Sequence, residues 1–167
     1  MNDVKRDGIA LSTTGEVRRI DTDAARESFE RALTDHAQAF ETFFVARLLD
    51  LSFTYLPEDA PDAEKEVCRL RFPVSEFLFN PQGSLHGGAI AAAMDISMGH
   101  LVNKVAGPGA TIAMKIQYMR PITAGMATCE GRFLRRGRQI SFLESRLWDE
   151  AERLVAVATA TWKMPSG

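Results

Sequence analysis

The segment at residues 80–95, NPQGSLHGGAIAAAMD, constrains the fold more than any other part of the chain. A short polar loop ends in His86-Gly87-Gly88 and runs directly into an apolar stretch with helical spacing that continues to about Val105. Such a helix has to be buried, and it carries one acid, Asp95, which is costly to desolvate unless it is paired or used. Two glycines open the helix N-terminus, where backbone amides favour a developing negative charge. The segment therefore indicates an enzyme that polarises a carbonyl at the helix start and activates water with Asp95.

Strand patterns flank this helix on both sides. Before it, apolar and polar residues alternate at residues 47–55 and again at 68–72, with a polar turn at 57–65. After Gly107-Pro108-Gly109, which ends the helix, strands are predicted at residues 112–118, 127–133, 140–148 and 154–162. In the first of these four, strict alternation places one set of apolar residues on a single face: Ile112, Met114, Ile116 and Tyr118. The order predicts an α+β fold in which an antiparallel β-sheet wraps around one central α-helix.

An extra helix is predicted near the N-terminus, from Asp23 to about Val45. Apolar residues recur there every three or four positions, at Phe29, Leu33, Ala37, Phe40 and Phe44. We expect one face of this helix to pack on the main body, and roles as a lid or a dimer contact stay open. The chain is accordingly divided into an N-terminal extension at residues 1–45 (a polar tail plus the amphipathic helix) and a main domain at residues 46–167.

Composition excludes several classes of protein. The 167 residues are 46% hydrophobic and 25% charged, which is ordinary for one globular domain. A net charge of −2 without a basic, aromatic-bearing stripe argues against a nucleic-acid partner. No stretch has the length of a signal peptide or a membrane span, and Cys68 and Cys129 stand alone in strand-like runs. We therefore expect a cytoplasmic protein with reduced thiols and no membrane partner. Three scattered histidines predict no metal site.

The chain resembles the hotdog-fold acyl-CoA thioesterases, in particular the phenylacetate-degradation (PaaI-like) branch. The resemblance rests on three features and covers roughly residues 46–164. The run at 80–88 fits the N-x-x-G-x-x-H-G-G signature, Asp95 follows eight residues after the first glycine of the pair, and residues 111–121 read TIAMKIQYMRP. The resemblance implies hydrolysis of an acyl-CoA to a free acid and coenzyme A. No cofactor is implied, because coenzyme A is part of the substrate.

Catalytic roles carried over from the family fall on five residues. The Gly87 amide would stabilise the oxyanion, and Asp95 would act as general base on water or as nucleophile. His86 and Asn80 would position the loop and the thioester, although Asn80 is as readily explained by holding the turn. Thr111 stands where the family has a hydroxyl that orients the water or the acid. That residue is often Ser, so Thr keeps the hydroxyl and adds a methyl group.

Helix geometry then predicts a dimer. Gly87 and Asp95 are eight positions apart, which is about 12 Å of axial rise on one helix. Water held at Asp95 cannot attack a carbonyl held at Gly87 of the same chain. Two antiparallel helices from two subunits bring these groups together, so we expect a homodimer with composite sites, in which Gly99 and the alanines at 91–93 permit close packing. Further assembly into a homotetramer is implied by the resemblance alone.

Substrate contacts are predicted more broadly. The acyl pocket is expected to involve Gly88, Met94, Met98 and Phe79, because methionines give an adaptable lining. Coenzyme A phosphates are expected to contact four basic residues, Arg120 and the turn residues Arg135, Arg136 and Arg138. Solvated charges in a hairpin turn explain the run at 135–138 equally well. Two other functions remain open, a non-catalytic acyl-CoA-binding protein and an enoyl-CoA hydratase that depends on His100. Asp95 and His100 match a D-x4-H hydratase spacing, but they are about 140° apart on the helix, which favours chance.

Overall fold

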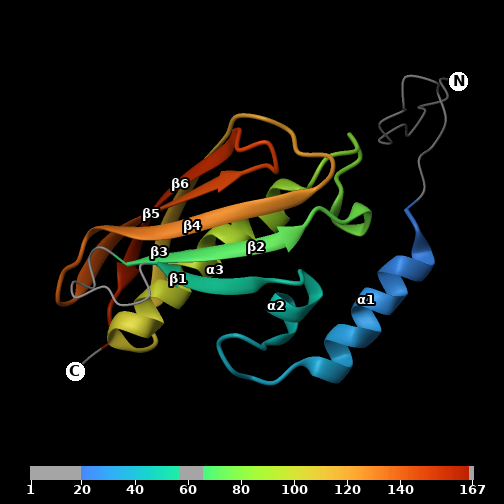
Figure 1. Cartoon of the computed structure of the whole chain (residues 1–167). Coiled ribbons are helices and arrows are strands. Elements are labelled where there is room, and N and C mark those ends of the chain that lie inside the picture. The colour runs from blue at the N-terminus through green and yellow to red at the C-terminus, as the bar shows by residue number, and fades with distance from the viewer. Residues whose placement is uncertain (1–19, 57–65, 166–167) are drawn as a thin grey trace, which may run out of the picture.

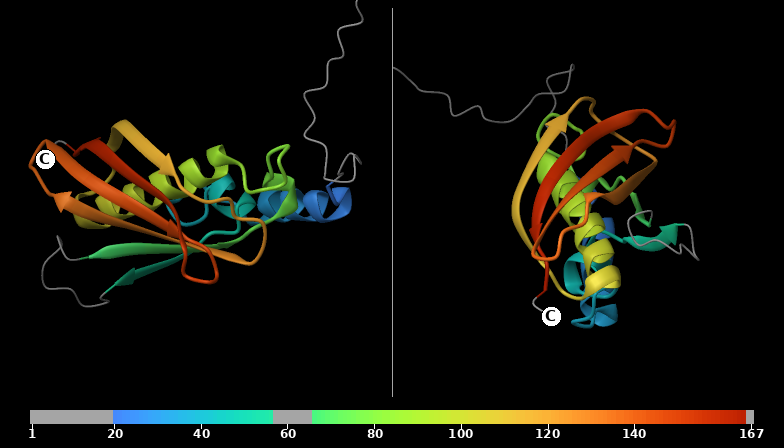
Figure 2. Two further views of the ribbon diagram at one scale, coloured as in Figure 1. Left: turned by 90° about the horizontal axis from the view of Figure 1, so that it is seen from above. Right: turned by 90° about the vertical axis from the view of Figure 1, so that its left-hand side faces the viewer.

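Six antiparallel strands and one long helix form the body of the protein. A computed structural model describes residues 20–56 and 66–165; the predicted polar turn at 57–65 and the tail at residues 1–19 lie outside them. The strands are β1 (Ser52–Leu56), β2 (Val67–Pro73), β3 (Ala110–Tyr118), β4 (Met126–Arg135), β5 (Ile140–Trp148) and β6 (Leu154–Lys163). They form one sheet in the order β1-β2-β4-β5-β6-β3. Helix α3 (Gly87–Ala106) lies in the concave face of this sheet (Figures 1 and 2). The predicted α+β architecture is confirmed.

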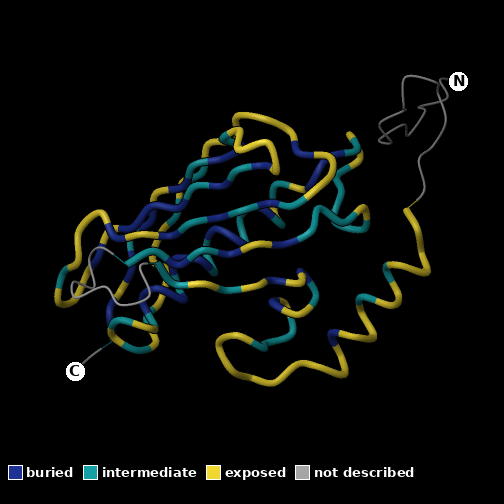
Figure 3. Tube along the Cα trace, in the orientation of Figure 1, coloured by how far each residue is buried: buried dark blue, intermediate teal, exposed yellow. Residues whose placement is uncertain are grey.

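The core lies between α3 and the sheet, where the strand alternation turns apolar residues inward. Figure 3 shows that the buried residues are found mainly along the strands and α3. On β4 the inward residues Ala127, Cys129, Gly131 and Phe133 are all buried. Gly131 permits the closest approach, because a Cβ atom there would stand 2.7 Å from the backbone carbon of Ser97 on α3. The helix therefore rests directly on the sheet backbone at this point.

Both cysteines are free and buried, as the sequence predicted. Burial raises the pKa of the Cys129 thiol to about 11 and also raises that of Cys68. These thiols stay protonated in the core at neutral pH, where they act as small apolar groups.

The N-terminal part corrects two predictions. The expected helix at 23–45 is broken: α1 (Thr22–Asp35) ends before His36, and α2 (Phe44–Leu48) follows after an irregular segment at residues 36–43. The segment turns because Phe40 and Phe43 reach the ring of His100 on α3, and such tertiary contacts override helix propensity. The first strand also begins later than expected, at Ser52, since residues 44–48 belong to α2.

Helix α1 is attached more lightly than α3. Asp21 caps its start by accepting hydrogen bonds from the amides of Asp23 and Ala24. Only Ala32 is buried along its length, and Phe29 meets Phe44 of α2 edge to face at 5.4 Å. Within the described ranges no helix combines the length and the apolar character needed to cross a membrane. The division of the chain at residue 45 stays a prediction.

Candidate active site

The loop before α3 is held by Asn80. Its side-chain oxygen accepts hydrogen bonds from the amides of Gln82 at 3.0 Å and Ser84 at 3.3 Å, and its amide nitrogen donates to the Ser84 hydroxyl at 3.0 Å. Gly83 completes the turn with a φ of 78° that favours glycine. These contacts of Asn80 all lie inside the loop, in accordance with the turn-holding interpretation.

The start of α3 presents one free backbone donor. His86 is the N-cap residue, and its Nδ1 accepts a hydrogen bond from the Gly88 amide at 2.8 Å. Within residues 20–56 and 66–165 the Gly87 amide has no hydrogen-bond acceptor. A free N–H at the positive end of a 20-residue helix is a suitable donor to an oxyanion. His86 thus occupies the neighbouring amide and leaves that of Gly87 available.

Asp95 is less buried than the sequence predicted. It lies near the middle of α3, and in the single chain it is partly exposed. Its Oδ1 accepts a hydrogen bond of 2.7 Å from the Thr111 hydroxyl on β3. The structure therefore joins two residues that the sequence had placed in one site.

A β-bulge directs Thr111 toward Asp95. Thr111 pairs with Trp162 of β6 and Ala113 pairs with Thr161, so that Ile112 is an extra residue in β3. Strict alternation predicted Ile112 on the same face as Met114, which leaves the opposite face to Thr111. The bulge corrects that prediction: Thr111 faces the helix, and Ile112 is 56% exposed.

Strand β3 runs alongside α3, and a side chain near each of its ends is hydrogen-bonded to a different part of the helix. The Thr111 end holds Asp95, and at the other end the Tyr118 hydroxyl donates to the Gly87 carbonyl at 3.0 Å. One chain thus carries a base at one end of the strand and an amide donor at the other. Eight helical positions separate them, or about 12 Å.

An apolar cavity of about 400 Å³ opens beside Asp95. One wall is the N-terminal segment, through Gln38, Ala39, Phe40 and Phe43. The other wall consists of Asp95, Ile96, Gly99 and His100 on α3, with Trp162 of β6. The sequence missed Phe40, Phe43, Ile96 and Trp162, because only the break at residues 36–43 brings them together.

The other predicted pocket residues lie elsewhere. Met94 and Met98 are completely buried in the core and do not line this cavity. Ala93, which was expected at a helix–helix contact, is also completely buried. Phe79 forms a β-bridge with Leu85 in the loop that leads to α3. Their contribution to substrate binding stays a prediction.

His100 is held among aromatic side chains. Its ring stacks on Phe53 with centroids 4.0 Å apart, and Nδ1 lies 3.3 Å from the Tyr55 hydroxyl. Burial lowers the pKa of His100 below its ordinary value, and this outweighs the opposing effects of the Phe40 backbone and the Glu41 charge. His100 and Asp95 both border the cavity despite their angular separation on the helix.

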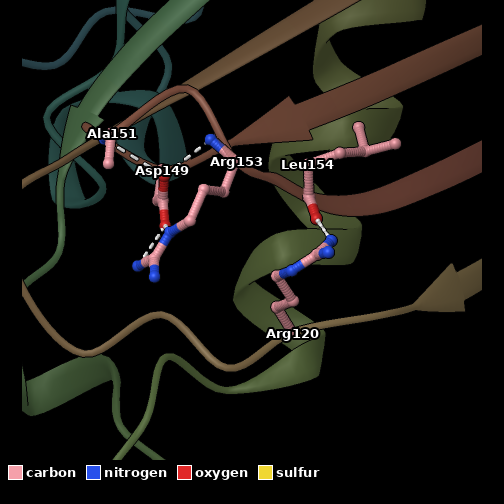
Figure 4. A network of polar contacts seen from close by, with 5 residues as sticks. All are labelled: Arg120, Asp149, Ala151, Arg153 and Leu154. Carbon is pink, nitrogen blue, oxygen red and sulfur yellow. Dashed lines mark hydrogen bonds and ion pairs between the residues drawn. The ribbon is translucent and has the colours of Figure 1, made fainter.

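The predicted phosphate-binding arginines are spread over two ends of the molecule. Arg120 follows β3 and donates to the Leu154 carbonyl at 2.7 Å, beside the turn that Asp149 and Arg153 close (Figure 4). Arg135 ends β4, and Arg136 and Arg138 lie in the β4–β5 turn. Arg136 donates to the Val105 carbonyl at 3.4 Å, near the C-terminal end of α3. Within one chain these groups do not converge on Asp95.

Metal ligands do not gather in the part of the chain that the structure describes, where no three His, Cys, Asp or Glu side chains could hold an ion. The absence of a metal from the reaction stays a prediction.

Comparison with known proteins identifies the family. The sequence pattern of the thioesterase superfamily matches residues 82–156, which include the start of α3, Asp95 and β3. A protein of Saccharolobus solfataricus named "putative esterase" is 30% identical over 132 residues, covering 78% of this chain and 93% of that protein. The chain belongs to the thioesterase superfamily.

Two further relatives refine this placement. The medium/long-chain acyl-CoA thioesterase YigI of Escherichia coli K12 is 28% identical over 118 residues, covering 59% of this chain and 76% of YigI. A solved structure of a phenylacetic acid degradation-related protein from Ralstonia eutropha superposes with a TM-score of 0.64 at 26% identity, covering 82% and 99% of the two chains. The PaaI-like resemblance is confirmed, and this member of the superfamily is a thioester hydrolase. A purely non-catalytic binding module is therefore set aside.

Proposed function

We propose that this thioesterase hydrolyses acyl-CoA in composite sites of a homodimer, with Asp95 of one subunit acting beside Gly87 of the other. The observation that carries the proposal is the 2.7 Å hydrogen bond from Thr111 to Asp95 at the edge of an apolar cavity. It holds a carboxylate in a fixed orientation where an apolar acyl group can lie. The acyl-CoA specificity of YigI supports coenzyme A as the thiol.

The edge strand β3 supports the dimer. One side of β3 is unpaired in the sheet order, and only Met114 and Ile116 of its nine residues are even partly buried. An exposed edge with apolar residues is a template for pairing with another strand. Because Ile112 is an extra residue outside the pairing, antiparallel pairing of two copies centred on Lys115 would set Thr111 opposite Tyr118 of the partner subunit.

That register brings the two half-sites together. Thr111 is bonded to Asp95, and Tyr118 is bonded to Gly87 in each chain. A two-fold axis that passes between the two β3 strands at Lys115 therefore sets Asp95 of one copy near Gly87 of the partner subunit, and the dimer has two such sites. The two groups of one site then come from different chains, so the axial distance between Gly87 and Asp95 of the same helix no longer matters.

The chemistry follows from these groups. Water adds to the thioester carbonyl carbon while Asp95 accepts its proton, and the oxyanion forms against the Gly87 amide. When the intermediate collapses, the carbon–sulfur bond breaks and the thiolate takes up a proton, which yields a free acid and a thiol. Attack by the Asp95 carboxylate itself, followed by hydrolysis of the anhydride, is the other route. Arg120, Arg135, Arg136 and Arg138 are proposed to meet the coenzyme A phosphates, with tetramer formation and a cytoplasmic location as further expectations.

An enoyl-CoA hydratase that uses His100 is disfavoured. Its ring is stacked on Phe53 and bordered by Phe40 and Phe43, and one ring nitrogen contacts Tyr55. This packing explains His100 without a catalytic role.

The test of Asp95 measures thiol release from acyl-CoA. Asp95→Asn is expected to lower kcat by about 100- to 10,000-fold, the usual range for loss of a general base, while the dimer persists in sedimentation. Enoyl-CoA substrates are assayed for hydration in parallel, and acyl-carrier-protein thioesters test the identity of the thiol. Unchanged thiol release by Asp95→Asn would overturn the proposal.

The test of Gly87 replaces this residue by proline, which has no amide hydrogen. Gly87 is the first helical residue, where proline is tolerated, and His86 already has the extended backbone (φ −61°, ψ 135°) that precedes proline. Gly87→Pro is expected to lower kcat by about 100- to 1,000-fold. Gly87→Ala keeps the N–H and would place its Cβ at an ordinary 3.4 Å from Tyr118, so it is the matched control with activity near that of the wild type.

Mixing the two inactive variants tests the dimer. A mixed dimer of Asp95→Asn and Gly87→Pro subunits has one cleft with both defects and one cleft with neither. Co-refolded protein is expected to regain thiol release, whereas sites contained within one chain would stay inactive in every mixture.

A further inference from the structure

The cavity beside Asp95 lies on the side of α3 that the sheet leaves uncovered. One wall is formed by α3 residues together with Trp162 of β6, and the opposite wall by residues of the irregular segment at 36–43 between α1 and α2. Asp95 stands at its edge with the carboxylate fixed by Thr111. When the carbonyl of a thioester lies at Asp95, the group attached to that carbonyl can therefore extend into the cavity.

The lining of the cavity is suited to an apolar group. The large apolar side chains in the lining are those of Phe40, Phe43, Ile96 and Trp162, and Asp95 is the one carboxylate among the described lining residues. A coenzyme A thioester is polar on the thiol side of the reacting bond, so the acyl side is the part that such a lining accepts.

The cavity is also limited in size. Its volume of about 400 Å³ is near the lower end of the roughly 300–1,000 Å³ that small-molecule sites occupy. Trp162 lies so close to α3 that a Cβ atom on Gly99 would stand 2.9 Å from the indole ring. The indole therefore closes the space beside Gly99 and limits how far an acyl chain can extend.

The N-terminal wall has a defined conformation. The Ala37 amide donates to the Thr42 carbonyl at 2.9 Å, and the Phe43 amide donates to the Ala39 carbonyl at 3.0 Å. Phe40 packs edge to face on the His100 ring at 5.5 Å. The segment is closed on itself and docked on α3, so its side chains present a fixed surface to a ligand.

We infer that residues 38–43 and the adjoining face of α3 form the acyl-binding pocket, and that this pocket selects an apolar acyl group of intermediate length. The inference rests on the proposed function and assigns to the N-terminal extension the choice of substrate. Phe40, Phe43 and Ile96 determine specificity, whereas His100 is a positioning residue that docks the segment.

The experiment compares thiol release across acetyl-, hexanoyl-, decanoyl- and palmitoyl-CoA. The wild type is expected to prefer the intermediate chains. Phe40→Ala enlarges the pocket and is expected to raise the decanoyl to hexanoyl ratio of kcat/KM by about tenfold, the lower end of what methylene groups in a pocket are worth. Ala39→Leu fills the pocket and is expected to shift preference toward acetyl-CoA by a similar factor.

The matched control is Phe142→Ala. Phe142 lies on β5, is 43% exposed against 42% for Phe40, and does not border the cavity. It is expected to leave the ratio unchanged. Ala39→Leu removes no packing group, so it decides the question even if Phe40→Ala fails to fold.

The results that would overturn this inference differ from those that would overturn the proposed function. A wild type that releases thiol, but whose chain-length profile is the same in both pocket variants, overturns this inference and leaves the proposed function standing. A wild type that releases no thiol from any acyl-CoA overturns both.

Discussion

The sheet and α3 are packed more tightly than the N-terminal helices α1 and α2. In the first region Phe72, Leu70 and Met98 are completely buried, and Gly131 leaves no room for a methyl group. In the second, Phe29 and Leu33 are each about half exposed, at 47% and 50%, and α1 buries only Ala32. The dense region holds Asp95, Thr111 and Gly87, whose geometry the proposed reaction requires to be constant. The looser region supplies a wall of the cavity, where a change of side chain alters what fits without disturbing these three residues.

Truncation of one phenylalanine in each region should give the largest contrast. Phe72→Ala is expected to lower the free energy of unfolding by about 3–5 kcal/mol, since it opens a cavity in a close-packed core. Phe29→Ala, which loses an exposed edge-to-face contact, is expected to cost about 1 kcal/mol. Chemical denaturation measures both, and equal losses would contradict the distinction.

Loss of the Thr111 hydroxyl should affect activity more than stability. Thr111→Val keeps the shape of the side chain but removes the hydrogen bond to Asp95, and such a bond to a charged group is worth about 1.5–3 kcal/mol. The expected fall in kcat/KM is roughly tenfold to a hundredfold. Thr111→Ser should restore most of the activity, and Thr159→Val, an exposed position on β6, is the control.

Removal of the α1 cap should have a local effect. Asp21→Ala loses both hydrogen bonds to the first turn and is expected to destabilise α1 by about 1 kcal/mol. Hydrogen exchange should accelerate in α1 while β4 and β5 keep their protection. Faster exchange in the central strands would show that the two regions unfold together.

Acid should weaken the contact between the two regions through His100. Because burial holds the folded-state pKa of His100 below the unfolded value of about 6.5, the unfolded chain binds the proton more readily. Stability is fully present above that unfolded pKa and declines as pH falls through it. His100→Phe lacks this group, so the difference in unfolding free energy between the two proteins is expected to shrink or reverse in sign between neutral and mildly acidic pH. A constant difference would exclude the effect.

The fold was predictable because its periodicities are clear. Alternation on β4 and the apolar run of α3 each bury one side, and Gly107 ends the helix with a φ of 92°. The Asp95 and Thr111 pair was predictable only through the resemblance. Alternation alone puts Thr111 on the face opposite Met114, since no sequence signal marks the bulge at Ile112.

The cavity beside Asp95 was not predictable, for a different physical reason. Helical spacing at Phe40 and Phe44 is real, but the contacts of Phe40 and Phe43 with His100 decide the conformation of that segment. These contacts join residues some sixty positions apart, so they cannot be predicted from local helix propensity. Met94 and Met98, which were predicted to line the acyl pocket, are completely buried in the core instead of bordering this cavity.

The extra residue in β3 has a consequence for how this strand tolerates shortening. Deleting a residue from a regular strand turns every side chain on one side of the cut to the opposite face. Ile112 already stands outside the pairing, with Thr111 and Ala113 each matched to consecutive residues of β6. Excision of Ile112 would leave both flanks in their present orientation and the threonine hydroxyl still aimed at the carboxylate, whereas excision of Lys115 would not.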